Sequence, residues 1–124
     1  MKEIISTNKA PAAVGTYSQG VKFNGVYYFS GQIGIDPETG IMSQSFDEQL
    51  SQVMKNIDGL LESQELKRED IIKTTIFLED LGDFGKVNET YVNYFSEPYP
   101  ARSCVQAAKL PKDALVEIEV IAGK

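Results

Sequence analysis

The strongest structural signal in the sequence is a run of apolar residues at helical spacing in its first half. Their separations of three and four positions place them on one face of an α-helix, which has to be buried against other elements. Ser45 and Glu48 have the spacing of a capping box, so the helix is predicted to begin there. The apolar residues are Phe46, Leu50, Val53, Met54, Ile57, Leu60 and Leu61.

A second helix is predicted to begin near Asp83. It cannot continue through Pro98 and Pro100, because proline lacks an amide donor and disfavours a helical backbone in the residue before it. The apolar side of this helix comprises Phe84, Val87, Tyr91, Tyr94 and Phe95.

The other patterned segments predict strands. Val21–Ser30 has the pattern of two short strands joined by a tight turn at Asn24-Gly25. A turn is predicted at Asp36–Gly40, where proline presets φ and glycine tolerates positive φ. Further strands are predicted at Lys73–Leu78, Ser103–Ala107 and Leu115–Ala122.

This order of elements predicts one α+β domain over residues 1–124, with a mixed β-sheet and two helices packed on one face. The other sheet face would then need cover. Strands rich in Tyr and Ile that expose one face in so small a protein indicate oligomerisation.

The composition excludes several kinds of chemistry. The chain has no histidine and a single cysteine, Cys104. It therefore cannot assemble a Ser-His-Asp or Cys-His nucleophile, a typical zinc site or an internal disulfide. We predict no metal, and acid–base chemistry that depends on carboxylates, Tyr, Lys, Cys or ordered water.

Charge and hydropathy limit the partners. The formal net charge is −6, and the twelve Lys and Arg residues are scattered among eighteen acids, which argues against a nucleic-acid binder. No apolar run approaches the roughly 20 residues of a membrane span, and the first residues are too polar for a secretory signal. We therefore expect a cytoplasmic protein without nucleic-acid or membrane partners.

Arg102 is the first candidate for a site residue. It follows Pro100-Ala101 at the predicted start of a strand. A guanidinium there can hold a substrate carboxylate through two parallel hydrogen bonds. The alternative is an ordinary surface ion pair with one of the many acids.

Glu117 and Glu119 form the second candidate pair. Strand alternation places both carboxylates on the face opposite Val116, Ile118 and Val120. On a solvent-exposed face they would need no special role. If a neighbouring subunit covers that face, one of them can position a water molecule or transfer protons.

Other residues are open to two interpretations. Cys104 is more typical of a small buried apolar residue than of a nucleophile. Tyr17 lies in a loop flanked by glycines, where its hydroxyl is either presented or packed. Ser30-Gly31 ends a strand, where the missing Cβ permits close approach of a ligand or marks a β-bulge. Asn88 departs from the apolar side of the second helix and is solvated or part of a site.

Short segments with distinctive residues recur along the chain: Ala10–Ala13, Tyr17–Gly20, Ser30–Gln32, Asp36–Gly40, Lys73–Thr75, Val87–Glu89, Pro100–Val105 and Leu110–Glu119. In order and spacing, these segments together resemble the RidA (YjgF) family from about residue 4 to residue 122. The Pro-Ala-Arg-Ser-Cys-Val segment and the Leu-Pro-Lys-Asp ending are the specific ones.

The resemblance implies a chorismate-mutase-like fold assembled as a homotrimer with three clefts between subunits. It also implies a 2-iminobutanoate/2-iminopropanoate deaminase, which hydrolyses 2-aminoacrylate and related imines to 2-keto acids and ammonia without a cofactor. By position, Arg102 would bind the substrate carboxylate and Glu117 would orient water. The cleft would also be lined by Tyr17, Ser30, Gly31, Asn88 and Cys104.

One departure from the family pattern concerns the Tyr17 loop. Thr16 stands where the family usually has proline, so the loop is less restrained. Two other functions remain open on sequence alone. A regulatory module would bind a metabolite in the same cleft without turnover. RNA cleavage is disfavoured by the acidic charge and the absence of histidine.

Overall fold

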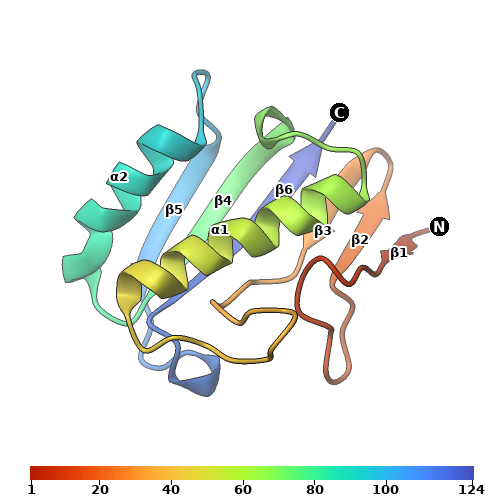
Figure 1. Ribbon diagram of the computed structural model, residues 1–124. Helices are drawn as coiled ribbons and strands as arrows, with labels where there is room; N and C mark the ends of the chain where they lie inside the picture. The colour runs from red at the N-terminus through yellow and green to blue at the C-terminus, as the bar shows by residue number, and fades with distance from the viewer.

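A computed structural model describes residues 1–124 as a six-stranded mixed sheet with two α-helices on one face (Figure 1). The strand order is β1-β2-β3-β6-β4-β5, and only β4 and β5 pair in parallel. The predicted α+β architecture is confirmed. Neither helix combines the length and the apolar character that crossing a bilayer requires. The elements are β1 (Glu3–Ile5), β2 (Gly20–Phe23), β3 (Val26–Phe29), α1 (Phe46–Ser63), β4 (Ile71–Leu78), α2 (Phe84–Tyr94), β5 (Ala101–Gln106) and β6 (Val116–Gly123).

The predicted turns are also confirmed. Strands β2 and β3 form an antiparallel hairpin closed by Asn24 and Gly25, whose φ angles are 52° and 78°. Positive φ at both positions is typical of a type I′ turn, which explains the Asn-Gly pair. In the turn that begins at Asp36, the Gly40 amide donates to the Asp36 carbonyl at 2.8 Å, and Gly40 has φ of 74°.

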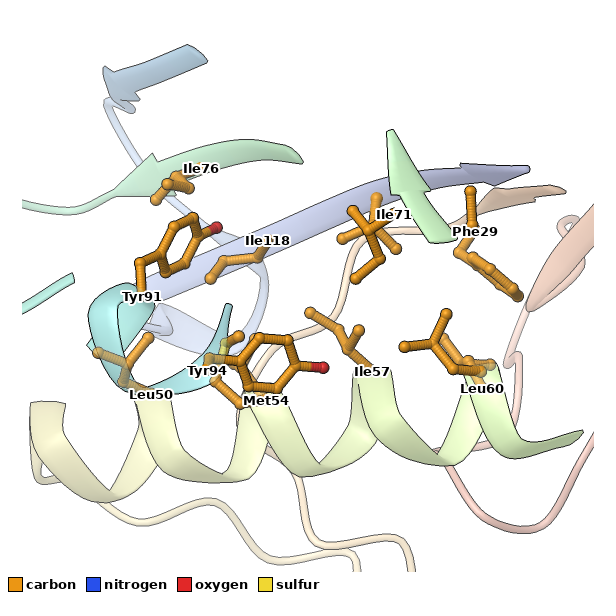
Figure 2. Packing of buried hydrophobic residues seen from close by; sticks show 14 of the residues in the cluster. Phe29, Leu50, Met54, Ile57, Leu60, Ile71, Ile76, Tyr91, Tyr94 and Ile118 are labelled. Atoms are coloured by element: carbon orange, nitrogen blue, oxygen red, sulfur yellow. The ribbon is translucent and has the colours of Figure 1, made fainter. Parts of the chain in front are cut away.

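Helix α1 packs its predicted apolar face on the sheet. All seven apolar residues of the pattern are buried. Figure 2 shows Leu50, Met54, Ile57 and Leu60 pointing from α1 toward the strands. Only half of the predicted capping box forms: the Ser45 hydroxyl accepts from the Glu48 amide at 3.4 Å, but the Ser45 amide donates to Ser43 Oγ at 3.0 Å instead.

A polar network joins helix α2 to α1. The Tyr94 hydroxyl donates to Asp58 on α1 at 2.5 Å, and Arg68 forms an ion pair with the same carboxylate at 2.8 Å. The Arg68 guanidinium lies 3.9 Å from the centroid of the Tyr94 ring. Burial and the Asp58 carboxylate raise the pKa of Tyr94, so its hydroxyl remains a donor. The network links α1 to the C-terminal end of α2, the helix that carries three of the residues discussed below.

Two strands begin earlier than the sequence predicted, and one strand was missed. Strand β4 begins at Ile71 rather than Lys73, and β5 begins at Ala101 rather than Ser103. The parallel register pairs Lys73 with Ala101, so Arg102 lies within a strand rather than before one. Strand β1 has three residues and forms through pairing with β2. These extensions depend on long-range pairing, which local sequence patterns do not contain.

The sheet has one covered and one uncovered face. Along β6, Val116, Ile118 and Val120 are buried under the helices, so the predicted placement of Glu117 and Glu119 on the opposite face is confirmed. No helix covers that second face (Figure 1). Strand alternation and register place several apolar side chains on it: Ile4, Val21, Phe23, Tyr28, Phe77, Val105 and Ile121.

Candidate functional site

The seven predicted site residues form two groups within one chain. Four of them line a cavity of about 550 Å³ between the N-terminal loop and the end of β3: Tyr17, Ser30, Gly31 and Glu117. Asn88 and Arg102 line a second hollow of about 360 Å³ at the edge of the sheet. Cys104 lies two residues beyond Arg102 on β5. We call the first group the carboxylate half-site and the second the guanidinium half-site.

The Tyr17 loop is anchored to the end of β3. The Ser30 hydroxyl donates to the Ser18 carbonyl at 2.6 Å, and the Ser30 amide donates to the Gln19 carbonyl at 2.9 Å. The Ser30 hydroxyl and amide therefore both bind the loop backbone and hold the loop against the end of β3. The Tyr17 side chain itself is 55% exposed, so it is presented at the surface of the single chain rather than packed in its core.

Gln19 organises the walls of the same cavity, a role that was not predicted from the sequence. Its side chain is 4% exposed and accepts from the Thr7 amide at 2.6 Å. Its amide nitrogen donates to the carbonyls of Thr7, Ala10 and Pro11 at 2.9, 3.3 and 2.7 Å. A buried amide with these bonds fixes the loop before Tyr17. A polar residue in a glycine-flanked loop does not reveal such burial in advance.

Gly31 makes room for Glu117. Gln32 and Ile118 exchange two backbone hydrogen bonds of 2.9 and 3.1 Å, which bring the end of β3 beside β6. A Cβ atom at residue 31 would collide with the Glu117 carboxylate. A larger residue at this position would displace the Glu117 side chain, so glycine allows the carboxylate to lie close to this backbone.

Glu117 is electrostatically distinct from an exposed glutamate. Burial raises the pKa of its carboxyl group, and the negative charge of Glu119 raises it further. A raised pKa makes the ionised carboxylate a stronger base. The position and the protonation behaviour of Glu117 both fit a residue that holds and activates water.

Arg102 is held by Asn88 and forms no ion pair. Its Nη1 donates to Asn88 Oδ1 at 2.6 Å. The six salt bridges of the chain do not include Arg102, so the surface ion pair weighed as an alternative is absent. Asn88 is engaged with this guanidinium rather than simply solvated. The Nε and Nη2 donors have no partner in the chain and remain available to a ligand carboxylate.

Neither Cys104 nor Tyr91 behaves as a nucleophile or a base here. Burial raises the pKa of the Cys104 thiol, and the nearby Arg102 charge lowers it less. The thiol is therefore protonated at neutral pH and a poor nucleophile. Burial likewise raises the pKa of Tyr91 to about 12, so its hydroxyl stays protonated. Glu117 is the only carboxylate among the predicted site residues, and a carboxylate can accept a proton from water.

The sheet separates the two half-sites within one chain. Arg102 pairs in register with Thr74, which is 1% exposed beneath the helices. Glu117 pairs with Phe77, whose side chain is on the uncovered face. Side chains on opposite faces of a sheet cannot converge on one small ligand.

Neither the cavity between the two helices nor any cluster of metal-ligating side chains provides a further candidate site. A cavity of about 620 Å³ lies between α1 and α2, and Asp58, Arg68 and Lys86 on its walls are already paired with one another or with neighbours. No group of three or more His, Cys, Asp or Glu side chains is placed to hold a metal ion.

Comparison with known proteins gives matches along the whole chain. The sequence model of the family described as endoribonuclease L-PSP matches residues 7–124. The 2-iminobutanoate/2-iminopropanoate deaminase of Salmonella typhimurium is 46% identical over 125 residues, with 98% of both chains covered. Reactive Intermediate Deaminase A of Arabidopsis thaliana chloroplasts is 49% identical over 122 residues, which cover 98% of this chain and 65% of that protein.

Solved structures agree with the sequence matches. RidA from an Antarctic Psychrobacter superposes with a TM-score of 0.95 at 48% identity, covering 98% of this chain and 99% of that one. Escherichia coli TdcF, crystallised with bound serine, superposes with a TM-score of 0.93 at 42% identity, covering 98% of both chains.

Proposed function

The chain belongs to the RidA (YjgF) family, and from this premise we propose that it is a deaminase that hydrolyses 2-imino acids to 2-keto acids and ammonia. Its substrates include 2-iminopropanoate, the tautomer of 2-aminoacrylate, and 2-iminobutanoate. A relative of 46% identity is named 2-iminobutanoate/2-iminopropanoate deaminase, and one of 49% identity is named Reactive Intermediate Deaminase A.

The observation that carries the proposal is the free donor edge of Arg102. Asn88 binds one nitrogen of the guanidinium, and no acid of the chain neutralises it. Every 2-imino acid has a carboxylate next to its C=N carbon, and this group matches the planar donor pair. TdcF, a structural neighbour, was crystallised with serine, which carries a carboxylate in the same position relative to its nitrogen.

The complete site belongs to two copies of the chain. A site that uses both residues needs Arg102 from one copy and Glu117 from another, since the sheet lies between them within one chain. The uncovered face supplies an apolar surface for such assembly: Tyr28 and Val105, which project from it, are each 46% exposed in the single chain. We propose a homotrimer, in which each of three clefts combines one carboxylate half-site with one guanidinium half-site.

The chemistry follows from these positions. Arg102 binds the carboxylate and so fixes the imine carbon relative to a water molecule held by Glu117. The Glu117 carboxylate accepts a proton from the water as the water oxygen bonds to the C=N carbon, and this proton then passes to the imine nitrogen. Collapse of the tetrahedral carbinolamine breaks the C–N bond and releases ammonia and the 2-keto acid. Water is the only co-reactant.

Turnover distinguishes this activity from metabolite sensing. Imines generated from alanine and 2-aminobutyrate by an amino-acid oxidase are trapped by semicarbazide, and purified protein is expected to lower the yield of semicarbazone by competing for the imine. Binding of 2-ketobutyrate without any change in semicarbazone yield would contradict the deaminase and favour a regulatory module. The net charge of −6 gives no support to RNA cleavage, despite the description of the family model.

A further inference from the structure

Arg102 is on the outermost strand of the sheet, where little backbone structure restrains it. Strand β5 pairs only with β4, and Arg102 is an exposed residue. A long side chain at such a position samples many rotamers, and binding a carboxylate in one geometry requires these to be lost. Something in the chain has to hold the guanidinium before the substrate arrives if binding is to be efficient.

One side of α2 contacts the Arg102 guanidinium and can hold it in place. Phe84, Asn88 and Tyr91 have the spacing i, i+4 and i+7, which places them on the same side of the helix. Asn88 accepts the hydrogen bond from Nη1. The centre of the guanidinium lies 5.0 Å from the centroid of the Phe84 ring and 5.7 Å from that of Tyr91. Both distances are within the range of cation–π attraction.

We propose that Phe84 is a positioning residue, which together with Tyr91 holds the Arg102 guanidinium in the orientation that receives the substrate carboxylate. This inference rests on the proposed function. The two rings attract the guanidinium, and Asn88 fixes its rotation through one nitrogen. The Nε and Nη2 donors are then left without a protein partner.

Phe84 and Tyr91 differ in how deeply they are embedded. Tyr91 is 6% exposed, and its hydroxyl points toward the strands that carry Ile76 and Ile118 (Figure 2). The buried hydroxyls of Tyr91 and Thr74 make no hydrogen bond of good geometry. Changes at Tyr91 therefore disturb the core. Phe84 is only partly buried at the start of α2, so Leu replaces its packing while removing the ring.

The test compares Phe84→Leu with Phe46→Leu. Phe46 is the first residue of α1, as Phe84 is of α2, and Lys86 lies 5.5 Å from its ring centroid. At 8% exposure Phe46 is more buried, so its replacement costs at least as much stability. Calorimetric binding of 2-ketobutyrate and the KM for 2-iminobutanoate are measured for both variants and for Phe84→Tyr.

Phe84→Leu is expected to weaken 2-ketobutyrate binding and to raise KM by roughly 3- to 30-fold, whereas Phe84→Tyr and Phe46→Leu stay within twofold. In an Arg102→Ala background, Phe84→Leu is expected to have no further effect on binding. The positioning role would be overturned if the Phe84→Leu variant bound 2-ketobutyrate as tightly as wild type. It would also be overturned if Phe84→Leu weakened binding by the same factor in the Arg102→Ala background. If Arg102→Ala itself bound 2-ketobutyrate normally, the proposed function would fail instead.

Discussion

Replacing Arg102 with alanine is expected to lower kcat/KM for 2-imino acid hydrolysis by roughly 30- to 4,000-fold, the equivalent of about 2–5 kcal/mol for a buried charge-assisted contact. The chain should stay folded, because Arg102 is exposed in the single chain and becomes buried only in the proposed cleft, and its one hydrogen bond is to the side chain of Asn88. Steady-state assays with freshly generated iminopropanoate, beside circular dichroism of the same sample, measure both effects.

The chain contains a matched control for this substitution. Arg68 is its only other arginine and pairs with Asp58 away from both half-sites. Arg68→Ala should reduce stability and leave kcat/KM within a few-fold of wild type. Arg102→Lys should lose most of the activity, since a single ammonium cannot reproduce the two parallel donors. Near-normal hydrolysis by Arg102→Ala would reject the carboxylate-binding role.

Replacing Glu117 with glutamine is expected to lower kcat by roughly 100-fold or more and to stabilise the protein at neutral pH. The amide occupies the same space but cannot accept a proton from water, and positioned bases typically contribute at least this factor. The raised pKa of Glu117 means that the folded protein holds this proton more tightly than the unfolded chain does. Above that pKa the ionised carboxylate therefore opposes folding, and glutamine removes the penalty.

The stabilisation by Glu117→Gln should depend on pH in a defined direction. It is full above the raised pKa and disappears as the pH falls below about 4.3, the ordinary value for glutamate, where both states are protonated. Urea unfolding at pH 7 and at pH 3.5 measures it. Glu119→Gln provides the control: it removes the neighbouring charge and should leave turnover close to wild type. A Glu117→Gln variant with wild-type kcat would contradict its role as the base.

The fold was largely predictable because its signals are local. Helical spacing from Phe46 to Leu61 located α1, the Asn24-Gly25 pair located a hairpin, and alternation along β6 separated Glu117 from Ile118. Strand β1 and the early start of β5 were not predictable in this way. Both depend on partners distant in sequence, and a three-residue strand has too few positions to show a pattern.

Candidate residues for the site could be proposed from the sequence, but their arrangement could not. The RidA resemblance named Arg102 and Glu117, yet no sequence pattern showed that they lie on opposite sides of one sheet. That fact depends on the parallel register of β5 with β4, which aligns Arg102 with buried Thr74. The burial of Gln19 and the approach of Glu117 to Gly31 are likewise products of tertiary packing.

The most direct test of whether each cleft is built from two copies is to combine two inactive variants in one assembly and to measure the activity that is recovered. Arg102→Ala and Glu117→Gln chains are co-expressed with different tags, and mixed assemblies are purified through both tags and assayed. Because each chain supplies the half-site that the other lacks, every mixed trimer has one of its three clefts complete, so the purified mixed assemblies should show roughly a third of wild-type turnover. Mixed assemblies no more active than either parent would show that Arg102 and Glu117 do not meet across subunits.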